Sequence, residues 1–314
     1  MTRTEVEFGS GGGTCRAWRY RPGPWSGSGT NPRPCVVMAH GFGATRDAGL
    51  EPYAARFAAA GMHVLLFDYR HFGASDGHPR HLVSVRRQLE DFANAVEFAR
   101  ALGDVDPTRI AVWGTSFSGG HALVTAARVP GVAAAVCQCP MMDGLAAVRR
   151  ILQYAGPAQL LRLTAHGLWD LCLAPFARAH YVPTVGPPGT LAIMSSEDAD
   201  AGYRALAPAD FRCEVTARIA LSVAFYRPAL QAARVSCPTL VQVCEKDSVA
   251  PTEATEVAIA RLASHGEARR YPIGHFEPYF GEHFERSVGD QVEFLARHLQ
   301  DTARVTPTES LTSP

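Results

Sequence analysis

A nine-residue stretch near the middle of the chain places a serine on a sharp turn between a strand and a helix. Residues 112–120 read VWGTSFSGG. Residues 109–113 predict a short strand, and the alanine-rich sequence that follows the turn predicts a helix. Such a turn crowds the positions two before and two after the serine, and Gly114 and Ser118 are both small. The turn exposes the hydroxyl of Ser116, which makes this serine a candidate nucleophile.

Apolar runs of strand length alternate with helical patterns along most of the chain. After a hairpin predicted from residues 5–8 and 14–20, strands are predicted at 34–40, 63–68, 132–139 and 238–243, and helices at 50–60, 82–102, 121–127 and 253–264. This alternation indicates βαβ units around a buried parallel sheet. Functional loops in such sheets follow the carboxyl ends of the strands. We therefore expect residues 41–44, Ser116, Asp247 and His275 at one edge of the sheet.

Five ordered motifs make the chain resemble the α/β-hydrolase superfamily. They read HGFGA at 40–44, DYRHFGASDG at 68–77, GTSFSGG at 114–120, EKDSVAP at 245–251 and GHFEPY at 274–279. The resemblance runs from about residue 34 to about residue 299. Within the superfamily, the chain is similar to dienelactone-hydrolase-like and prolyl-peptidase-like esterases, and to polyketide acyltransferases. It implies an α/β fold with a mostly parallel sheet and helices on both faces. The chain departs from the usual motifs at Ser118 and His71, where glycine is common.

The nucleophile requires a base, because a neutral serine hydroxyl is a poor nucleophile. His275 is the best candidate. It follows the strand predicted at residues 268–272 and precedes the final helix predicted near residues 285–298. His283, eight residues later, is the fallback.

A carboxylate is expected to orient the base and to stabilise its charged form. Asp247 follows the strand predicted at residues 239–244 and precedes His275. The resulting order of serine, acid and histidine is the one typical of this fold. Two alternatives remain open: Glu245 lies two residues away, and Asp143 follows the preceding strand.

The tetrahedral intermediate formed at the serine needs hydrogen-bond donors for its oxyanion. The backbone N–H groups of Phe42 and Phe117 are the candidates, because one follows His40-Gly41 and the other follows the nucleophile. Gly41 and Gly43 permit a close approach of the first loop. We expect His40 to support this loop without taking part in catalysis.

Residues 143–234 form the chief departure from a minimal hydrolase. Apolar positions recur at helical spacing in residues 147–154, 160–172 and 215–225. An insertion here would begin at the sheet edge that carries Ser116, so we predict a helical lid over that edge. The hydrolase core would then comprise residues 1–142 and 235–300, followed by a disordered tail at 301–314.

The predicted lid is also expected to supply the acyl pocket. Its apolar residues exceed what a lid with one solvated face requires, so a mostly apolar site is indicated. Trp169, Phe225 and Tyr226 are the candidate substrate-binding residues in this segment. We expect such a site to prefer medium or bulky hydrophobic acyl groups over acetate.

Composition restricts the possible partners and the compartment. The 314 residues are 47% hydrophobic and carry 30 acidic and 30 basic side chains. This balance gives no electrostatic reason to expect nucleic acid. The first eight residues are polar, and no apolar run approaches the ~18 residues of a membrane span. Eight scattered cysteines are typical of free thiols, so we expect a cytoplasmic protein.

The leading functional hypothesis is a serine hydrolase that cleaves a small-molecule carboxylic ester or thioester through an acyl-enzyme. The first alternative is an acyltransferase, in which an alcohol or amine replaces water. The second is a non-catalytic binding protein on a hydrolase fold. A serine nucleophile argues against dehalogenase and epoxide hydrolase chemistry, which uses aspartate in this fold. The motifs imply neither a metal nor an organic cofactor, and they give no oligomeric state.

Overall fold

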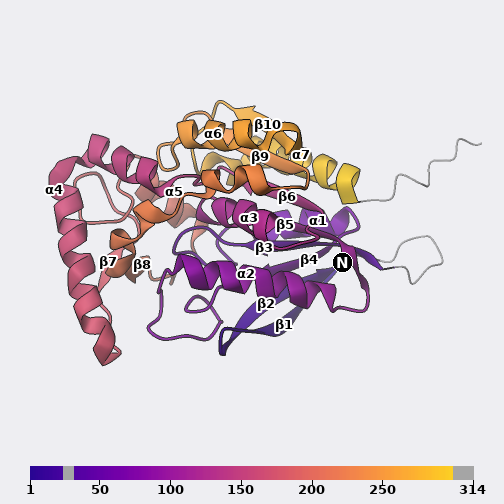
Figure 1. The fold of residues 1–314 in the computed structure, drawn as a ribbon, viewed down its shortest axis with the longest axis horizontal. Helices are drawn as coiled ribbons and strands as arrows, with labels where there is room; N and C mark the ends of the chain where they lie inside the picture. Colours follow the sequence, from indigo (N-terminus) through magenta and orange to yellow (C-terminus); the bar gives the residue numbers. More distant parts are fainter. Residues whose placement is uncertain (24–31, 300–314) are drawn as a thin grey trace, which may run out of the picture.

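The computed structural model describes residues 1–23 and 32–299. A central sheet of eight strands has the order β1-β2-β4-β3-β5-β6-β9-β10 (Figure 1). The strands are β1 (Thr2–Ser10), β2 (Gly13–Arg21), β3 (Arg33–Ala39), β4 (His63–Phe67), β5 (Val105–Thr115), β6 (Ala134–Gln138), β9 (Thr239–Cys244) and β10 (Gly266–Tyr271). The hairpin β1–β2 and its contact with β4 are antiparallel, and the other pairs are parallel. The predicted α/β architecture is confirmed.

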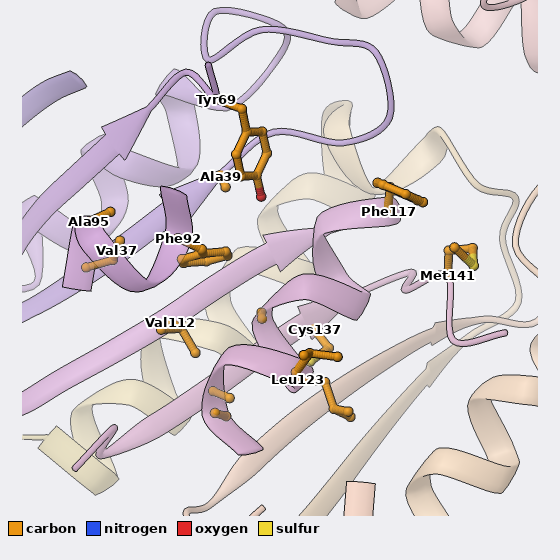
Figure 2. Close-up of a cluster of buried hydrophobic side chains, with 14 of the residues drawn as sticks. Val37, Ala39, Tyr69, Phe92, Ala95, Val112, Phe117, Leu123, Cys137 and Met141 are labelled. Atoms are coloured by element: carbon orange, nitrogen blue, oxygen red, sulfur yellow. The ribbon is translucent and has the colours of Figure 1, made fainter. Parts of the chain in front are cut away.

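Helices cover both faces of this sheet because its central strands are apolar on both sides. They are α1 (Glu51–Ala59), α2 (Val85–Arg100), α3 (Phe117–Arg128), α6 (Thr252–Leu262) and α7 (Gly281–Leu299). Alternate strand residues join two separate cores: Val112 packs with Phe92 of α2, and Trp113 packs with Phe294 of α7. Figure 2 shows the first core, in which α3 lies beside β5 with Phe117 at its start.

A long insertion separates β6 from β9. It contains α4 (Gly144–Leu173), η1 (Ala174–Phe176), β7 (Tyr181–Pro183), α5 (Ala199–Leu206), β8 (Glu214–Thr216), η2 (Ala217–Leu221), η3 (Val223–Phe225), η4 (Pro228–Leu230) and η5 (Ala232–Arg234). Two of the predicted helices fall within α4, which is kinked at Gly156 (φ 74°) and Pro157. The helix predicted at 215–225 is wrong. Val215 and Thr216 pair with β7 as a short strand, and 3-10 turns follow.

The remaining short elements are η6 (Ala263–His265) and η7 (Glu277–Tyr279). No helix in the described ranges combines the length and hydropathy required to cross a bilayer. All eight cysteines are free, with six of them buried and Cys172 exposed. The tail predicted at residues 301–314 lies outside the described residues.

Candidate active site

Ser116 lies on the predicted turn between β5 and α3. Its backbone has φ 55° and ψ −120°, a strained conformation for a residue with a side chain. The Ser116 N–H donates to the carbonyl of Gln138 at 2.9 Å, and the Gly119 N–H donates to the carbonyl of Ser116 at 3.0 Å. A Cβ at Gly114 would lie 1.8 Å from the carbonyl oxygen of Ser118. Glycine is therefore required at position 114, and the backbone holds the serine at the tip of the turn.

Ser118 occupies the place where glycine is usual because its hydroxyl is used. It is fully buried, donates to the carbonyl of His40, and lies 2.7 Å from the Tyr69 hydroxyl. The serine thus connects the start of α3 to the loop after β3. His40 itself lies in the core, and its Nδ1 is 3.0 Å from the carbonyl of Gly41. This contact is consistent with the supporting role expected for His40.

His71, the second departure from the usual motif, also uses its side chain. Its backbone φ is 76°, in the left-handed region that favours glycine. Nδ1 lies 2.9 Å from the carbonyl of Pro79, and Nε2 lies 2.7 Å from the Arg87 guanidinium. Burial, together with nearby arginines, lowers the pKa of His71 to about 4. The neutral ring therefore donates to Pro79 and accepts from Arg87, which fixes the loop after β4.

Ser116, His275 and Asp247 form one hydrogen-bonded chain at the carboxyl edge of the sheet. His275 Nε2 lies 3.0 Å from Ser116 Oγ, and His275 Nδ1 lies 2.6 Å from Asp247 Oδ2. The other carboxylate oxygen of Asp247 accepts the backbone N–H groups of Val249 and Ala250 at 2.8 and 2.6 Å. His275 and Asp247 are only 3% and 6% exposed. The structure therefore brings together all three residues that the sequence nominated.

Electrostatics at this chain favour a charged imidazole. Burial disfavours the imidazolium of His275, but the adjacent Asp247 carboxylate outweighs that effect and raises the pKa of His275 to about 9. In its neutral form, a base with this raised pKa binds the proton of the Ser116 hydroxyl strongly. The same carboxylate fixes the tautomer that presents Nε2 to the serine.

The alternative residues have other roles. Asp143 accepts the N–H groups of Leu145 and Ala146 at the start of α4, and its second oxygen pairs with Arg227 at 2.8 Å. Glu245 is exposed to solvent. His283 lies on α7, and its Nε2 is 3.8 Å from Oε1 of Glu277. None of these alternatives forms part of the Ser116–His275 chain of contacts.

Phe42 and Phe117 both lie beside the serine, on two different segments of the chain. A Cβ added at Gly41 would lie 3.4 Å from the Cβ of Ser116, so the loop passes directly beside the nucleophile. Phe117 is the first residue of α3, and such N–H groups have no partner within their own helix. The two phenyl rings pack edge to face at 5.3 Å. This packing holds together the two segments whose N–H groups were expected to receive an oxyanion.

A second carboxylate near the histidine was missed in the sequence. Asp198 lies just before α5 and accepts hydrogen bonds from Ser196 at 3.1 Å and from Ser248, the residue after Asp247. Its charge also helps to raise the pKa of His275. This contribution is smaller than those of Asp247 and Cys139, which act in the same direction, and smaller than the opposing effect of burial. The insertion therefore contacts the loop that carries the candidate acid. No motif marks residue 198, because its position depends on how the whole insertion folds.

Two cavities meet at Ser116 and share Phe42 and Met194 in their walls. The first lies on the His275 side and is otherwise bordered by apolar residues such as Leu206, Phe276 and Tyr203. The second lies under α4 and includes Val148, Ile151, Tyr154, Ile193 and Val223. The insertion supplies walls to both cavities, which gives the nucleophile an apolar space on either side.

The structure places none of the three predicted substrate-binding residues in the walls of these two cavities. Trp169 is 59% exposed and Phe225 is 83% exposed. Trp169 lies on the segment of α4 beyond the kink, and Phe225 ends a 3-10 turn at the surface. Tyr226 is buried, and its ring packs 5.3 Å from that of Phe117. It therefore supports the residue after the nucleophile and does not border either cavity.

Metal-ligand chemistry has no evident place at this site. Within residues 1–23 and 32–299, no group of three or more His, Cys, Asp or Glu side chains is arranged to hold a metal ion. The groups around Ser116 are instead a hydroxyl, an imidazole, a carboxylate and backbone amides. These groups are suited to acyl chemistry.

The fold and the position of this site define an α/β-hydrolase enzyme. Residues 30–277 match the family described as serine aminopeptidase, S33, and the chain belongs to this family. It is 40% identical over 296 residues to the quorum-quenching protein AidA of Acinetobacter baumannii (strain MDR-ZJ06), covering 93% of this chain and 94% of that protein.

Fungal relatives and a solved structure extend the comparison. The polyketide transferase grgF of Penicillium sp. is 28% identical, with 95% of this chain and 98% of that protein covered. Its crystal structure, that of an α/β hydrolase, superposes with a TM-score of 0.81 at 25% identity, covering 95% and 99% of the two chains. Thiohydrolase aneE of Aspergillus aculeatus is 38% identical over 143 residues, 45% of this chain and 43% of that protein.

Proposed function

We propose that this enzyme is a serine hydrolase that cleaves a carboxylic ester or thioester through an acyl-enzyme on Ser116. The observation that carries the proposal is the continuous contact from Ser116 Oγ through His275 to Asp247. A serine in contact with a base, and a base in contact with a carboxylate, is the arrangement that activates a hydroxyl for acyl transfer.

In the proposed mechanism, Ser116 Oγ attacks the acyl carbon while His275 Nε2 takes the hydroxyl proton. The carbonyl oxygen becomes an oxyanion that accepts hydrogen bonds from the N–H groups of Phe42 and Phe117. His275 then gives its proton to the departing alcohol or thiol, which leaves an ester on Ser116. A water molecule, deprotonated by His275, attacks this ester, and the bond between the acyl carbon and Ser116 Oγ breaks. His275 returns the proton to Ser116 Oγ as the acid leaves. Asp247 retains its negative charge throughout and stabilises the imidazolium.

The substrate we propose carries a medium or bulky hydrophobic acyl group. The cavity under α4 supports this choice, because Val148, Ile151, Ile193 and Val223 present aliphatic side chains to its interior. An acetyl group is too short to contact most of these side chains and would gain little from apolar burial. One relative is named as a thiohydrolase, so thioesters belong among the candidate substrates.

Acyl transfer to an alcohol or amine is the second candidate. The apolar cavity on the His275 side of Ser116 favours it, because a hydrophobic acceptor bound there would exclude the competing water. The relative named as a polyketide transferase gives further support. Under this alternative, the chemistry on Ser116 is unchanged up to the acyl-enzyme.

The decisive experiment measures turnover of p-nitrophenyl esters, acyl thioesters and acyl lactones of increasing chain length, with and without alcohol acceptors. We expect saturable release of the leaving group, with Ser116 labelled by a fluorophosphonate. A free acid product supports hydrolysis, whereas a new ester formed in aqueous buffer supports transfer. A folded protein that neither turns over these substrates nor takes the label would support the non-catalytic alternative.

A further inference from the structure

The outer half of α4 has two apolar faces, and only one of them is covered. Beyond the kink at Gly156, the inner face packs through Leu163 and Gly167 against η2. Asp170 on the same face is fully buried and holds Arg218 of η2 through two short contacts of 2.6 and 2.8 Å. One face of this helical segment is therefore buried against the rest of the protein.

The opposite face carries a stripe that no described part of the chain covers. We call this the outer stripe: Leu161, Ala165, Leu168, Trp169 and Cys172. Their spacing of i, i+4, i+7, i+8 and i+11 places them on one side of a helix. Leu161 is 71% exposed, Leu168 52% and Trp169 59%. Phe176, in the turn η1 that follows, is 74% exposed.

This exposure is unusual for a helix at the surface of a folded protein. A surface helix normally has a polar face toward water, and a helix that is apolar all round is normally buried. Within residues 157–173, the charged side chains are Arg162 and the buried, paired Asp170. Figure 1 shows α4 at the outer edge of the molecule, away from the central sheet, where its outer face is open to a partner.

We propose that the outer stripe is the contact surface of a homodimer, in which α4 packs against α4 of a second copy about a twofold axis. A twofold contact pairs a surface with itself, and an uncharged stripe of leucine, alanine and tryptophan is complementary to its own copy. The small Ala165 near the middle of the stripe permits two helices to approach closely. Spacing by four and seven residues is also the pattern by which helices interdigitate.

The exposed apolar area is large enough to mark an interaction site and would form the apolar centre of a dimer interface. Each large apolar side chain has ~200 Å² of surface, so the exposed parts add up to on the order of 500 Å² for Leu161, Leu168, Trp169 and the neighbouring Phe176. Patches of this size mark interaction sites, and standard interfaces bury ~800 Å² per partner, including a polar rim. A membrane surface is the other apolar partner to consider. Helices that lie on membranes have a basic polar face opposite the apolar one, whereas the opposite face of α4 is packed against η2.

The test is the mass of the protein in solution, by analytical ultracentrifugation over a range of concentrations. We expect the unmodified protein to sediment at twice the chain mass of 33.8 kDa. The double variant Leu161→Glu/Leu168→Glu should sediment as a single chain, because four carboxylates would be buried in its dimer and should lower the dimer affinity at least ~100-fold. A matched control, Leu230→Glu/Val257→Glu, alters two residues that are each 47% exposed elsewhere, and it should remain dimeric.

Other outcomes would overturn the proposal. These are a single-chain mass for the unmodified protein at 100 µM, a dimer that persists in the Leu161/Leu168 variant, or equal dissociation of both variants. If the protein is monomeric and binds phosphatidylglycerol vesicles through the outer stripe, the partner of this stripe is a lipid surface and not a second copy of the chain. Circular dichroism and turnover of a short-chain ester verify folding, and they are independent of the association state measured here.

Discussion

The hydroxyl oxygens of Ser118 and Tyr69 lie 2.7 Å apart in a site from which solvent is excluded. Ser118 also donates to the carbonyl of His40, so its side chain joins the first turn of α3 to the loops after β3 and β4. A glycine at position 118 would leave the Tyr69 hydroxyl and the His40 carbonyl without this partner. The serine is therefore part of the support for the loop that carries Phe42.

Replacing Ser118 by alanine should destabilise the protein by about 1–3 kcal/mol, because a buried hydroxyl and a carbonyl lose their partner. Equilibrium unfolding in urea measures this change. In the double variant Ser118→Ala/Tyr69→Phe the loss should be smaller than the sum of the two single losses. Strict additivity would indicate that the two hydroxyls are not coupled.

Replacing Ser116 by alanine should remove nearly all turnover while leaving the fold intact. We expect a loss on the order of 10⁴- to 10⁶-fold in kcat. The measurement is ester turnover by protein with an unchanged circular dichroism spectrum. Near-normal turnover would contradict the assignment of Ser116 as nucleophile.

Asp247→Asn should be less damaging than His275→Ala, and the two losses should not add, because both residues act through Ser116. Asparagine can still accept the backbone N–H groups of Val249 and Ala250, so the change mainly removes charge. Asp143→Asn is the matched control, since asparagine also caps a helix. Inactivation by Asp143→Asn, with no effect from Asp247→Asn, would reverse the choice of acid.

Activity should rise with pH. The pKa of His275 is raised to about 9, and only the neutral imidazole can take the proton of Ser116. The kcat/KM profile for an uncharged ester should therefore rise through an apparent pKa well above 6.5, and Asp247→Asn should move that midpoint to lower pH. A midpoint that is unaffected by Asp247→Asn would show that another group controls the profile.

The same shift predicts a pH-dependent stability. A group whose pKa is higher in the folded state stabilises that state fully below its unfolded pKa, here 6.5, and loses this effect as the pH rises through 9. The contribution amounts to about 3 kcal/mol. The difference in unfolding free energy between the wild type and Asp247→Asn should therefore shrink between pH 6 and pH 10. A constant difference over this range would argue against a charged His275 in the folded protein.

Filling the cavity under α4 should shorten the preferred acyl chain. Ile151 borders this cavity, and phenylalanine in its place would occupy part of the volume. Ile151→Phe should lower kcat/KM for long-chain esters while changing that for acetate esters little. Leu152→Phe is the control, because Leu152 is 43% exposed on the neighbouring position. Identical chain-length profiles for the two variants would show that this cavity does not bind the acyl chain.

Local patterns were enough to predict the sheet and the residues at its edge. Ser116, Asp247 and His275 each follow a strand that can be recognised from its run of apolar residues. Residues that follow parallel strands lie together at one edge of the sheet. The insertion was harder to predict. Trp169 lies in a segment that is apolar on both faces, so periodicity cannot identify the inward side. Asp198 and the three-residue strands β7 and β8 depend on contacts between segments distant in the chain, which no local pattern encodes.

Met194 stands between the two cavities and contributes to the walls of both. Its side chain is unbranched, with three rotatable bonds, and it adapts to irregular spaces. The Met194 side chain can therefore change its rotamer in the wall between the two cavities. A rotamer that enlarges one cavity narrows the other. Phe42 is the other side chain that both cavities share, so these two residues together decide how the space beside Ser116 is divided. A substitution at residue 194 would redistribute that space between the two parts of a substrate and leave Ser116, His275 and Asp247 in place.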